Sequence, residues 1–165
     1  MKKLLFPFLF LFLATTARAG DGDYYVKLDA GFLLHNTLNA SVGIEKQLLN
    51  YNAYELSFEG GNRFELDEVC GHYCRETFWD NYYWGVAATY KHCLSIGRNT
   101  VFRACFGPEC GSVKGRYFAA VNGGFELSIV FFRGAQLVFT QKNQVGFFHG
   151  DDFRNGLTIG LKLPL

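Results

Sequence analysis

The last nine residues of the chain, 157–165, read LTIGLKLPL and place a leucine or isoleucine at every second position. The positions between them hold Thr158, Gly160, Lys162 and Pro164. Successive side chains of a β-strand point to opposite faces, so this period of two predicts a strand with one apolar and one polar face. An amphipathic helix would need a period near 3.6 residues, which this segment does not follow.

The same alternation recurs through most of the chain that precedes this segment. Between residues 24 and 34, for example, Val26, Leu28 and Phe32 fall on one face, whereas Lys27 and Asp29 fall on the other. No stretch after residue 19 holds the roughly 18 consecutive apolar residues of a transmembrane helix. With the last segment included, we expect eight strands, in the ranges 24–34, 37–46, 52–62, 82–91, 100–107, 117–127, 135–143 and 157–165.

Strands of about ten residues are long enough to cross a bilayer when they are tilted. An open sheet in lipid would leave the backbone groups of its edges without hydrogen-bond partners, so closure is expected. The sequence therefore predicts an all-β protein, a small antiparallel up-and-down β-barrel of the outer-membrane type, formed by a single domain over residues 20–165.

The connections between the expected strands differ in length at the two ends of the barrel. At one end they are short or moderate, over residues 48–51, 92–99 and 128–134. At the other end they are longer and polar, over residues 63–81, 108–116 and 144–153, although His35-Asn36 is tight. With the N-terminus in the periplasm, the longer loops would face the outside, as bacterial outer-membrane barrels usually arrange them.

Alternation alone does not say which face points outward, and a soluble lipocalin-like barrel with an apolar ligand cavity is the main alternative. The polar faces favour the membrane barrel, because they carry few charges, with as many cations as carboxylates. A closed interior needs such pairing, since an unpaired buried charge is costly. The expected charge network of the interior consists of Lys27, Asp29, Glu45, Glu55, Glu59, Lys91, Arg103, Glu126, Lys142 and Lys162.

The N-terminal residues match a secretory signal peptide. Lys2-Lys3 precede an apolar run from Leu4 to Ala14, and the small-residue motif Ala17-Arg18-Ala19 follows it. We expect cleavage after Ala19 and export without a lipid anchor to the outer membrane. The whole chain has a formal charge of +1, with 16 basic and 15 acidic residues. Removing the three basic residues of the signal peptide leaves 13 against 15, or −2, so no basic surface suggests nucleic-acid binding.

In its C-terminal third the chain resembles the conjugal transfer protein TraO family of Bacteroidetes conjugative transposons. The residues that carry the resemblance are Gln141-Lys142-Asn143, the run 152–156 (DFRNG) and the ending 160–165 (GLKLPL), with Gly85 to Lys91 and Gly97-Arg98-Asn99 in the same pattern. The resemblance implies an outer-membrane component of a conjugation apparatus related to type IV secretion, with other conjugal transfer proteins as partners. It brings no catalytic residues. The chain ends in Leu165, whereas many outer-membrane barrels end in an aromatic residue.

The five cysteines allow several states. Cys70 and Cys74 lie close together in an expected loop, and Cys110 lies in a later loop at the same end. An oxidising compartment favours a disulfide among these three residues, with unpaired thiols and a metal site as the alternatives. An odd count leaves at least one thiol without a partner in the chain.

Aromatic residues gather at the start of the fourth expected strand, where Trp79, Tyr82 and Trp84 suit an interfacial girdle. A carbohydrate-stacking platform is the alternative for this cluster. The four histidines are scattered over expected turns and loops, so we expect no enzyme, no metal and no cofactor. Eight strands enclose an interior that side chains fill, which argues against conduction of DNA or a small-molecule substrate. A surface adhesin that binds through its loops is a further alternative.

Overall fold

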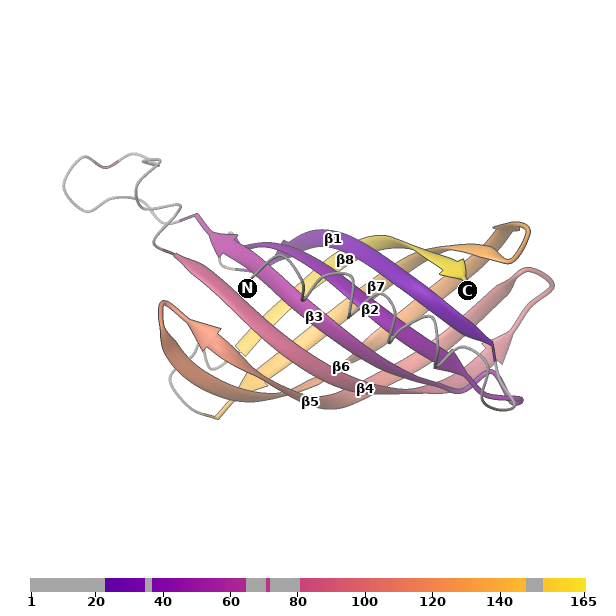
Figure 1. Cartoon of the computed structure of the whole chain (residues 1–165), viewed down its shortest axis with the longest axis horizontal. Helices are drawn as coiled ribbons and strands as arrows, with labels where there is room; N and C mark the ends of the chain where they lie inside the picture. The colour runs from indigo at the N-terminus through magenta and orange to yellow at the C-terminus, as the bar shows by residue number, and fades with distance from the viewer. Residues whose placement is uncertain (1–22, 35–36, 65–70, 72–80, 148–152) are drawn as a thin grey trace, which may run out of the picture.

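A computed structural model describes residues 23–34, 37–64, 71, 81–147 and 153–165. The expected signal peptide, residues 1–19, lies outside the described residues. The strands are β1 (Tyr24–Leu33), β2 (Thr37–Gln47), β3 (Ala53–Arg63), β4 (Tyr82–Ile96), β5 (Thr100–Val113), β6 (Arg116–Phe132), β7 (Ala135–Gly146) and β8 (Phe153–Pro164). They form a closed barrel in chain order, in which each strand pairs antiparallel with the next and β8 pairs with β1 (Figure 1). The predicted fold class is confirmed.

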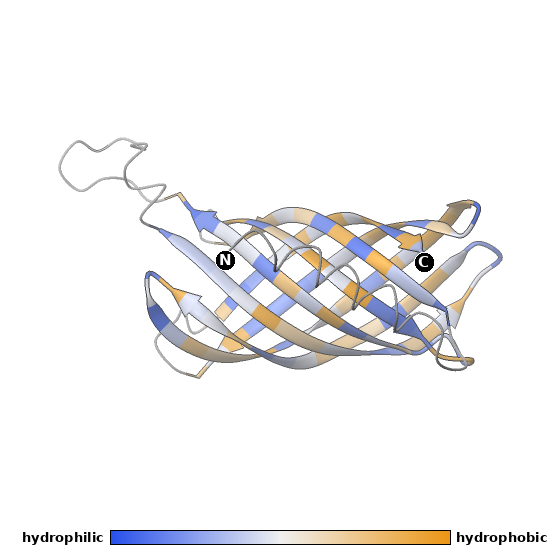
Figure 2. Ribbon diagram, viewed as in Figure 1, coloured by the Kyte–Doolittle hydropathy of each residue, from blue (hydrophilic) through white to orange (hydrophobic). Residues whose placement is uncertain are grey.

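Hydrophobic and hydrophilic residues alternate along the strands (Figure 2). The apolar side chains point outward, and the polar side chains point into the barrel. In β8, Leu157 is 68% exposed and Ile159 is 51% exposed, whereas the side chain of Lys162 is fully buried. Lys162 lies opposite Lys27 of β1 in the register, and both point into the interior. A lipocalin-like apolar cavity is therefore wrong for this chain, because its apolar face covers the outside.

The barrel has two ends that are used as landmarks below. The terminal end carries Tyr24 and Leu165, whose backbone groups are hydrogen-bonded to each other, and the turns at 48–52, 97–99 and 133–134. The distal end carries the connections 34–36, 64–81, 114–115 and 147–152. Among the described residues, no helix is long and apolar enough to cross a membrane.

Strands β4 to β8 are longer than their sequence pattern predicts, and β7 continues into the expected loop 144–153 as far as Gly146. The expected loop 108–116 is wrong, because β5 continues to Val113 and a two-residue turn at Lys114-Gly115 leads into β6. The expected connection 128–134 is likewise mostly strand and turns at Arg133-Gly134. Both residues of each turn have positive φ, between 45° and 83°, the conformation that matches the twist of a tight hairpin.

Pro108 explains why this part of β5 reads as a loop. A proline has no N–H for the ladder, and the pairing of β5 with β4 skips from Phe106 to Glu109. The pairing with β6 continues through Pro108, which lies opposite Val121. One intact ladder is therefore enough to keep the residues beyond the proline in the strand.

Two glycine pairs, Gly60-Gly61 and Gly123-Gly124, each contain one position where only glycine fits. A Cβ on Gly61 would lie 2.0 Å from the backbone oxygen of Leu38, and a Cβ on Gly124 would lie 1.9 Å from that of Gln141. The first glycine of each pair has no atom closer than 3.7 Å to its added Cβ. The strand register runs through both pairs without a shift, so these glycines permit close strand approach and are not bulges.

Candidate functional site

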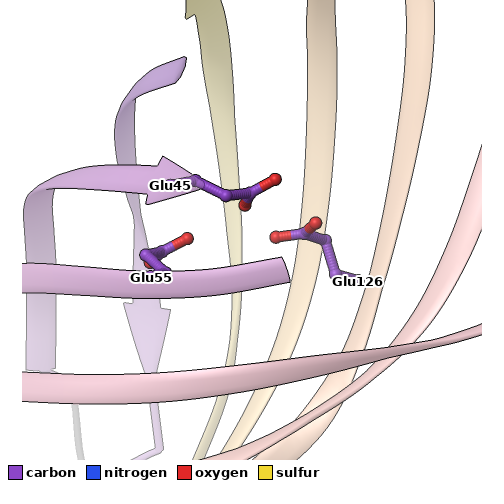
Figure 3. Close-up of side chains that lie close together, drawn as sticks. All are labelled: Glu45, Glu55 and Glu126. Atoms are coloured by element: carbon purple, nitrogen blue, oxygen red, sulfur yellow. The ribbon is translucent and has the colours of Figure 1, made fainter. Parts of the chain in front are cut away.

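The most concentrated chemistry of the described chain lies inside the barrel. Glu45 of β2, Glu55 of β3 and Glu126 of β6 point at one another, with carboxylate oxygens within 4.8 Å (Figure 3). All three residues are buried, and Glu45 and Glu126 are completely so. Three converging carboxylates carry three negative charges in a space with little water, so they require cations close by.

Lys91 of β4 supplies the central cation of this group. Its Nζ lies 2.5 Å from Glu45 Oε2 and 2.6 Å from Glu126 Oε2, and it also donates a hydrogen bond to Glu55. Lys162 of β8 adds a second ammonium, 2.6 Å from Glu45 Oε2 and 2.5 Å from Glu126 Oε1. The ammonium of Lys91 thus takes the place where these carboxylates would otherwise hold a metal ion.

Arg103 of β5 connects the charged interior to the turn at the terminal end. Its Nη1 lies 3.2 Å from Glu45 Oε1 and 3.1 Å from Glu126 Oε1. Its Nε donates to the backbone oxygen of Tyr51 at 2.9 Å, and its Nη2 donates to Gln47 Oε1 at 2.8 Å. The guanidinium is completely buried, so its planar fork fixes both the carboxylates and the β2–β3 turn. We call Glu45, Glu55, Glu126, Lys91, Lys162 and Arg103 the terminal cluster.

A second group of charges lies nearer the distal end. Lys142 Nζ lies 2.5 Å from Glu59 Oε2 and 2.9 Å from Glu109 Oε2. Asn122 also donates to Glu109 Oε2 at 2.6 Å, and Asn39 donates to Glu59 Oε2 at 3.4 Å. We call Lys142, Glu59 and Glu109 the distal cluster.

Lys27 and Asp29 of β1 lie between the two clusters. Lys27 Nζ is 2.8 Å from Asp29 Oδ2, 3.6 Å from Glu126 Oε2 and 3.7 Å from Glu55 Oε2. Ser41 also donates a hydrogen bond to Asp29 at 2.8 Å. All ten charged residues expected in the interior are thus directed into it, and their ion pairs involve all eight strands.

Sequence reasoning missed two charged residues of the interior, Glu109 and Arg154. Both are buried, at 2% and 5% exposure. Glu109 falls in the expected loop 108–116, whereas Arg154 falls between the expected loop 144–153 and the expected strand 157–165. Continuing each strand's alternation outward by a few residues would have placed both inside. Arg154 lies over the ring of Tyr83, 5.1 Å from its centroid.

A polar cavity of about 50 Å³ lies between the two clusters. It is lined in part by Asn39, Asn122 and Thr140, which have buried oxygens without a hydrogen-bond partner among the described residues. A cavity of this size and polarity has room for a few water molecules, which would satisfy these oxygens. Buried apolar side chains fill the interior toward both ends, with Leu33, Tyr83 and Phe118 on the distal side and Tyr25, Val101 and Val138 on the terminal side.

The cysteine prediction needs a correction. Cys110 is an exposed cysteine within β5, so its expected position in a loop is wrong. It was misplaced for the same reason as Glu109. Cys70 and Cys74 lie outside the described residues, so a disulfide among Cys70, Cys74 and Cys110 stays a prediction. Cys93 and Cys105 have no disulfide partner among the described residues.

Of the three aromatic residues expected in an interfacial girdle, Tyr82 and Trp84 lie within the described part of the chain. Tyr82 is 46% exposed and Trp84 is 38% exposed at the distal start of β4. Trp84 stacks on Phe58 of β3 with ring centroids 6.4 Å apart. Trp79 lies outside the described residues. Of the histidines, His92 is exposed on β4, while His35, His72 and His149 also lie outside the described part.

Comparisons with solved structures agree on the type of barrel. The N-terminal β-barrel domain of Pseudomonas aeruginosa OprF matches with a TM-score of 0.55 and 12% identity, over 88% of this chain and 100% of that one. A structure described as de novo design of transmembrane β-barrels matches with a TM-score of 0.55 and 11% identity, over 89% of this chain and 98% of that one. The designed TMB2.3 matches with a TM-score of 0.55 and 14% identity, over 90% of this chain and 98% of that one. No family model and no curated protein matches the chain. At these identities the likeness shows the fold alone, a barrel of the transmembrane type.

Proposed function

We propose that this protein is a non-enzymatic outer-membrane component of a conjugative DNA-transfer apparatus, with a structural or docking role. The observation that carries the membrane part is the direction of the side chains. Apolar residues cover the outside, while twelve charged residues, six of each sign, point into the interior. The conjugation part rests on the resemblance of Gln141-Lys142-Asn143, the run 152–156 and the ending 160–165 to the TraO family.

The filled interior supports a docking role over a conducting one. The terminal cluster, the distal cluster and the apolar side chains at both ends occupy the space that a translocated strand would need. Partners would therefore meet the barrel at its connections, its rims or its outer wall, and we expect those partners to be other conjugal transfer proteins and outer-membrane lipid. We further propose export through the signal peptide, with cleavage after Ala19.

Two experiments test this proposal separately. Fractionation of cells, followed by gel electrophoresis with and without heating, should place the protein in the outer membrane as a heat-modifiable barrel. Deletion of residues 64–78 from the β3–β4 connection should then leave heat modifiability intact but lower the frequency of conjugative transfer.

Other outcomes would contradict one part or the other. A purified protein that stays monodisperse in buffer without detergent would refute the membrane location. A barrel that is correctly inserted while transfer is unchanged in a strain lacking the protein would refute the conjugation role, and loss of binding to host cells or glycans would instead favour an adhesin.

A further inference from the structure

Three carboxamide side chains lie together on the outer wall of the barrel. Gln141 and Asn143 come from β7, and Asn155 comes from β8 directly opposite Asn143 in the register. Lys142, which lies between the first two, points inward to the distal cluster, so its neighbours on the strand point outward. We call Gln141, Asn143 and Asn155 the amide patch.

Some of the hydrogen-bonding groups of the amide patch pair with one another. Gln141 Nε2 donates to Asn143 Oδ1 at 2.9 Å, and Asn155 Nδ2 donates to the same oxygen. Among the described residues, the side-chain N–H groups of Asn143 and the side-chain oxygens of Gln141 and Asn155 have no hydrogen-bond partner. The patch therefore keeps both donors and acceptors for something outside the barrel.

Apolar side chains border the amide patch toward both ends of the barrel. On the terminal side, Phe125 and Leu157 are the register neighbours of Gln141 and are 48% and 68% exposed. On the distal side, Val145 and Phe153 pair with each other and are 45% and 49% exposed. The patch thus lies within the apolar belt and not beyond its edge.

Gly123 leaves open space beside the patch. It is the register neighbour of Asn143 on β6, and a Cβ added to it would meet no atom closer than 4.0 Å. The backbone at Gly123 needs no glycine for its own conformation or packing, in contrast to Gly124. A flat position next to hydrogen-bonding amides lets another backbone approach closely, which is how small residues act in membrane interfaces.

We propose that the amide patch is a contact surface between two copies of this chain within the membrane. This inference rests on the proposed membrane location, because hydrocarbon supplies neither donors nor acceptors and an unsatisfied amide there costs a few kcal/mol. A second copy suits the patch better than a lipid tail, because a two-fold axis brings the donors of one Asn143 to the acceptors of the other patch. Gly123 of each copy then lies at the close approach of the two walls.

The test uses the full-length mature protein, refolded into phosphatidylethanolamine and phosphatidylglycerol vesicles at several protein densities. Single-molecule photobleaching of dye-labelled protein measures the fraction of dimers, and heat-modifiable gel migration measures insertion independently. The variant Asn143→Leu/Asn155→Leu replaces the amides by side chains that lipid accepts. Gly123→Leu fills the flat position, and Gly60→Leu is its matched control, an outward glycine of β3 whose added Cβ would also meet no clash, with its nearest atom at 3.7 Å.

We expect the wild type and Gly60→Leu to form dimers whose fraction rises with protein density. For the other two variants we expect a dimer dissociation constant at least tenfold higher. Heat modifiability should be unchanged in all four proteins. A wild type that stays monomeric at every density would overturn the proposal and leave the patch to a lipid headgroup or another chain. Equal dimerisation of the double variant would also overturn it. A chain that does not insert at all would refute the membrane location, and the dimer with it.

Discussion

Lys91→Met is the substitution that tests most directly whether the interior charges hold the barrel together. Its effect follows from what each carboxylate retains when the central ammonium is lost. Glu45 and Glu126 keep Lys162 at 2.5–2.6 Å and Arg103 at 3.1–3.2 Å. Among the described residues, Glu55 keeps only Lys27 as a cation, at 3.7 Å, which is beyond hydrogen-bonding distance. One buried carboxylate, and not three, is therefore left without a hydrogen-bonded cation.

Breaking a buried ion pair by removing one partner typically lowers the free energy of unfolding by about 3–5 kcal/mol. We expect Lys91→Met to fall in that range, since a single carboxylate is orphaned. Adding Glu55→Gln removes the orphaned charge and should bring the double variant to within about 2 kcal/mol of the wild type. Lys46→Met is the control, because Lys46 lies at the rim over the ring of Tyr24 and should change stability by less than about 1 kcal/mol.

Equilibrium unfolding in urea, in lipid vesicles and monitored by tryptophan fluorescence, measures these free energies, and heat-modifiable gel migration reports the folded fraction independently. The reasoning would be refuted if Lys91→Met were as stable as Lys46→Met. It would also be refuted if the double variant Lys91→Met/Glu55→Gln were as unstable as Lys91→Met alone, because the cost would then not come from an unpaired Glu55.

Three further outcomes are expected from the same structure. Gly124→Ala should destabilise the barrel by about 1–3 kcal/mol in urea unfolding, because its Cβ would collide with the β7 backbone, whereas Gly123→Ala should stay within about 0.5 kcal/mol. Maleimide should label Cys105 mainly after heating, as read by peptide mass spectrometry, since Cys105 lines the inner cavity. Arg103→Lys should increase proteolytic cleavage in the β2–β3 turn, because lysine lacks the fork that reaches Tyr51 and the carboxylates together.

The alternation of side chains carries most of the fold, because in a membrane barrel every spanning strand has one face toward lipid and one toward the interior. The sequence shows which face of a strand points inward wherever charged residues and leucines alternate, as around Lys162. The prediction from alternation fails near Pro108, because a single residue that interrupts one ladder looks like the end of a strand. The continuing pairing with β6 is a tertiary fact that no local pattern reveals.

The sequence predicts which charged residues point into the interior, but it does not predict which of them form ion pairs with one another. Lys91 reaches carboxylates 35 to 46 positions away in the chain, and which of them it meets depends on the stagger of strands around the closed barrel. A shift of one residue in the pairing of β2 or β3 would turn Glu45 or Glu55 toward the outside. Glu109 and Cys110 were misplaced for a different reason, because ending β5 at Pro108 assigns every residue beyond the proline to a loop.

The placement of charge in this barrel also determines where recognition takes place. In a water-soluble enzyme, converging carboxylates and lysines in a pocket would suggest a catalytic centre. In this barrel most large apolar side chains face outward, and the charged side chains fill the middle of the interior instead. Ion pairs join five inward cations to all six inward carboxylates, so most of their binding capacity is already used within the barrel. The amide patch is the opposite case, because its unsatisfied groups point outward from a wall that is mostly apolar. A partner within the membrane is therefore expected at Gln141, Asn143 and Asn155, and not at the more conspicuous charges inside.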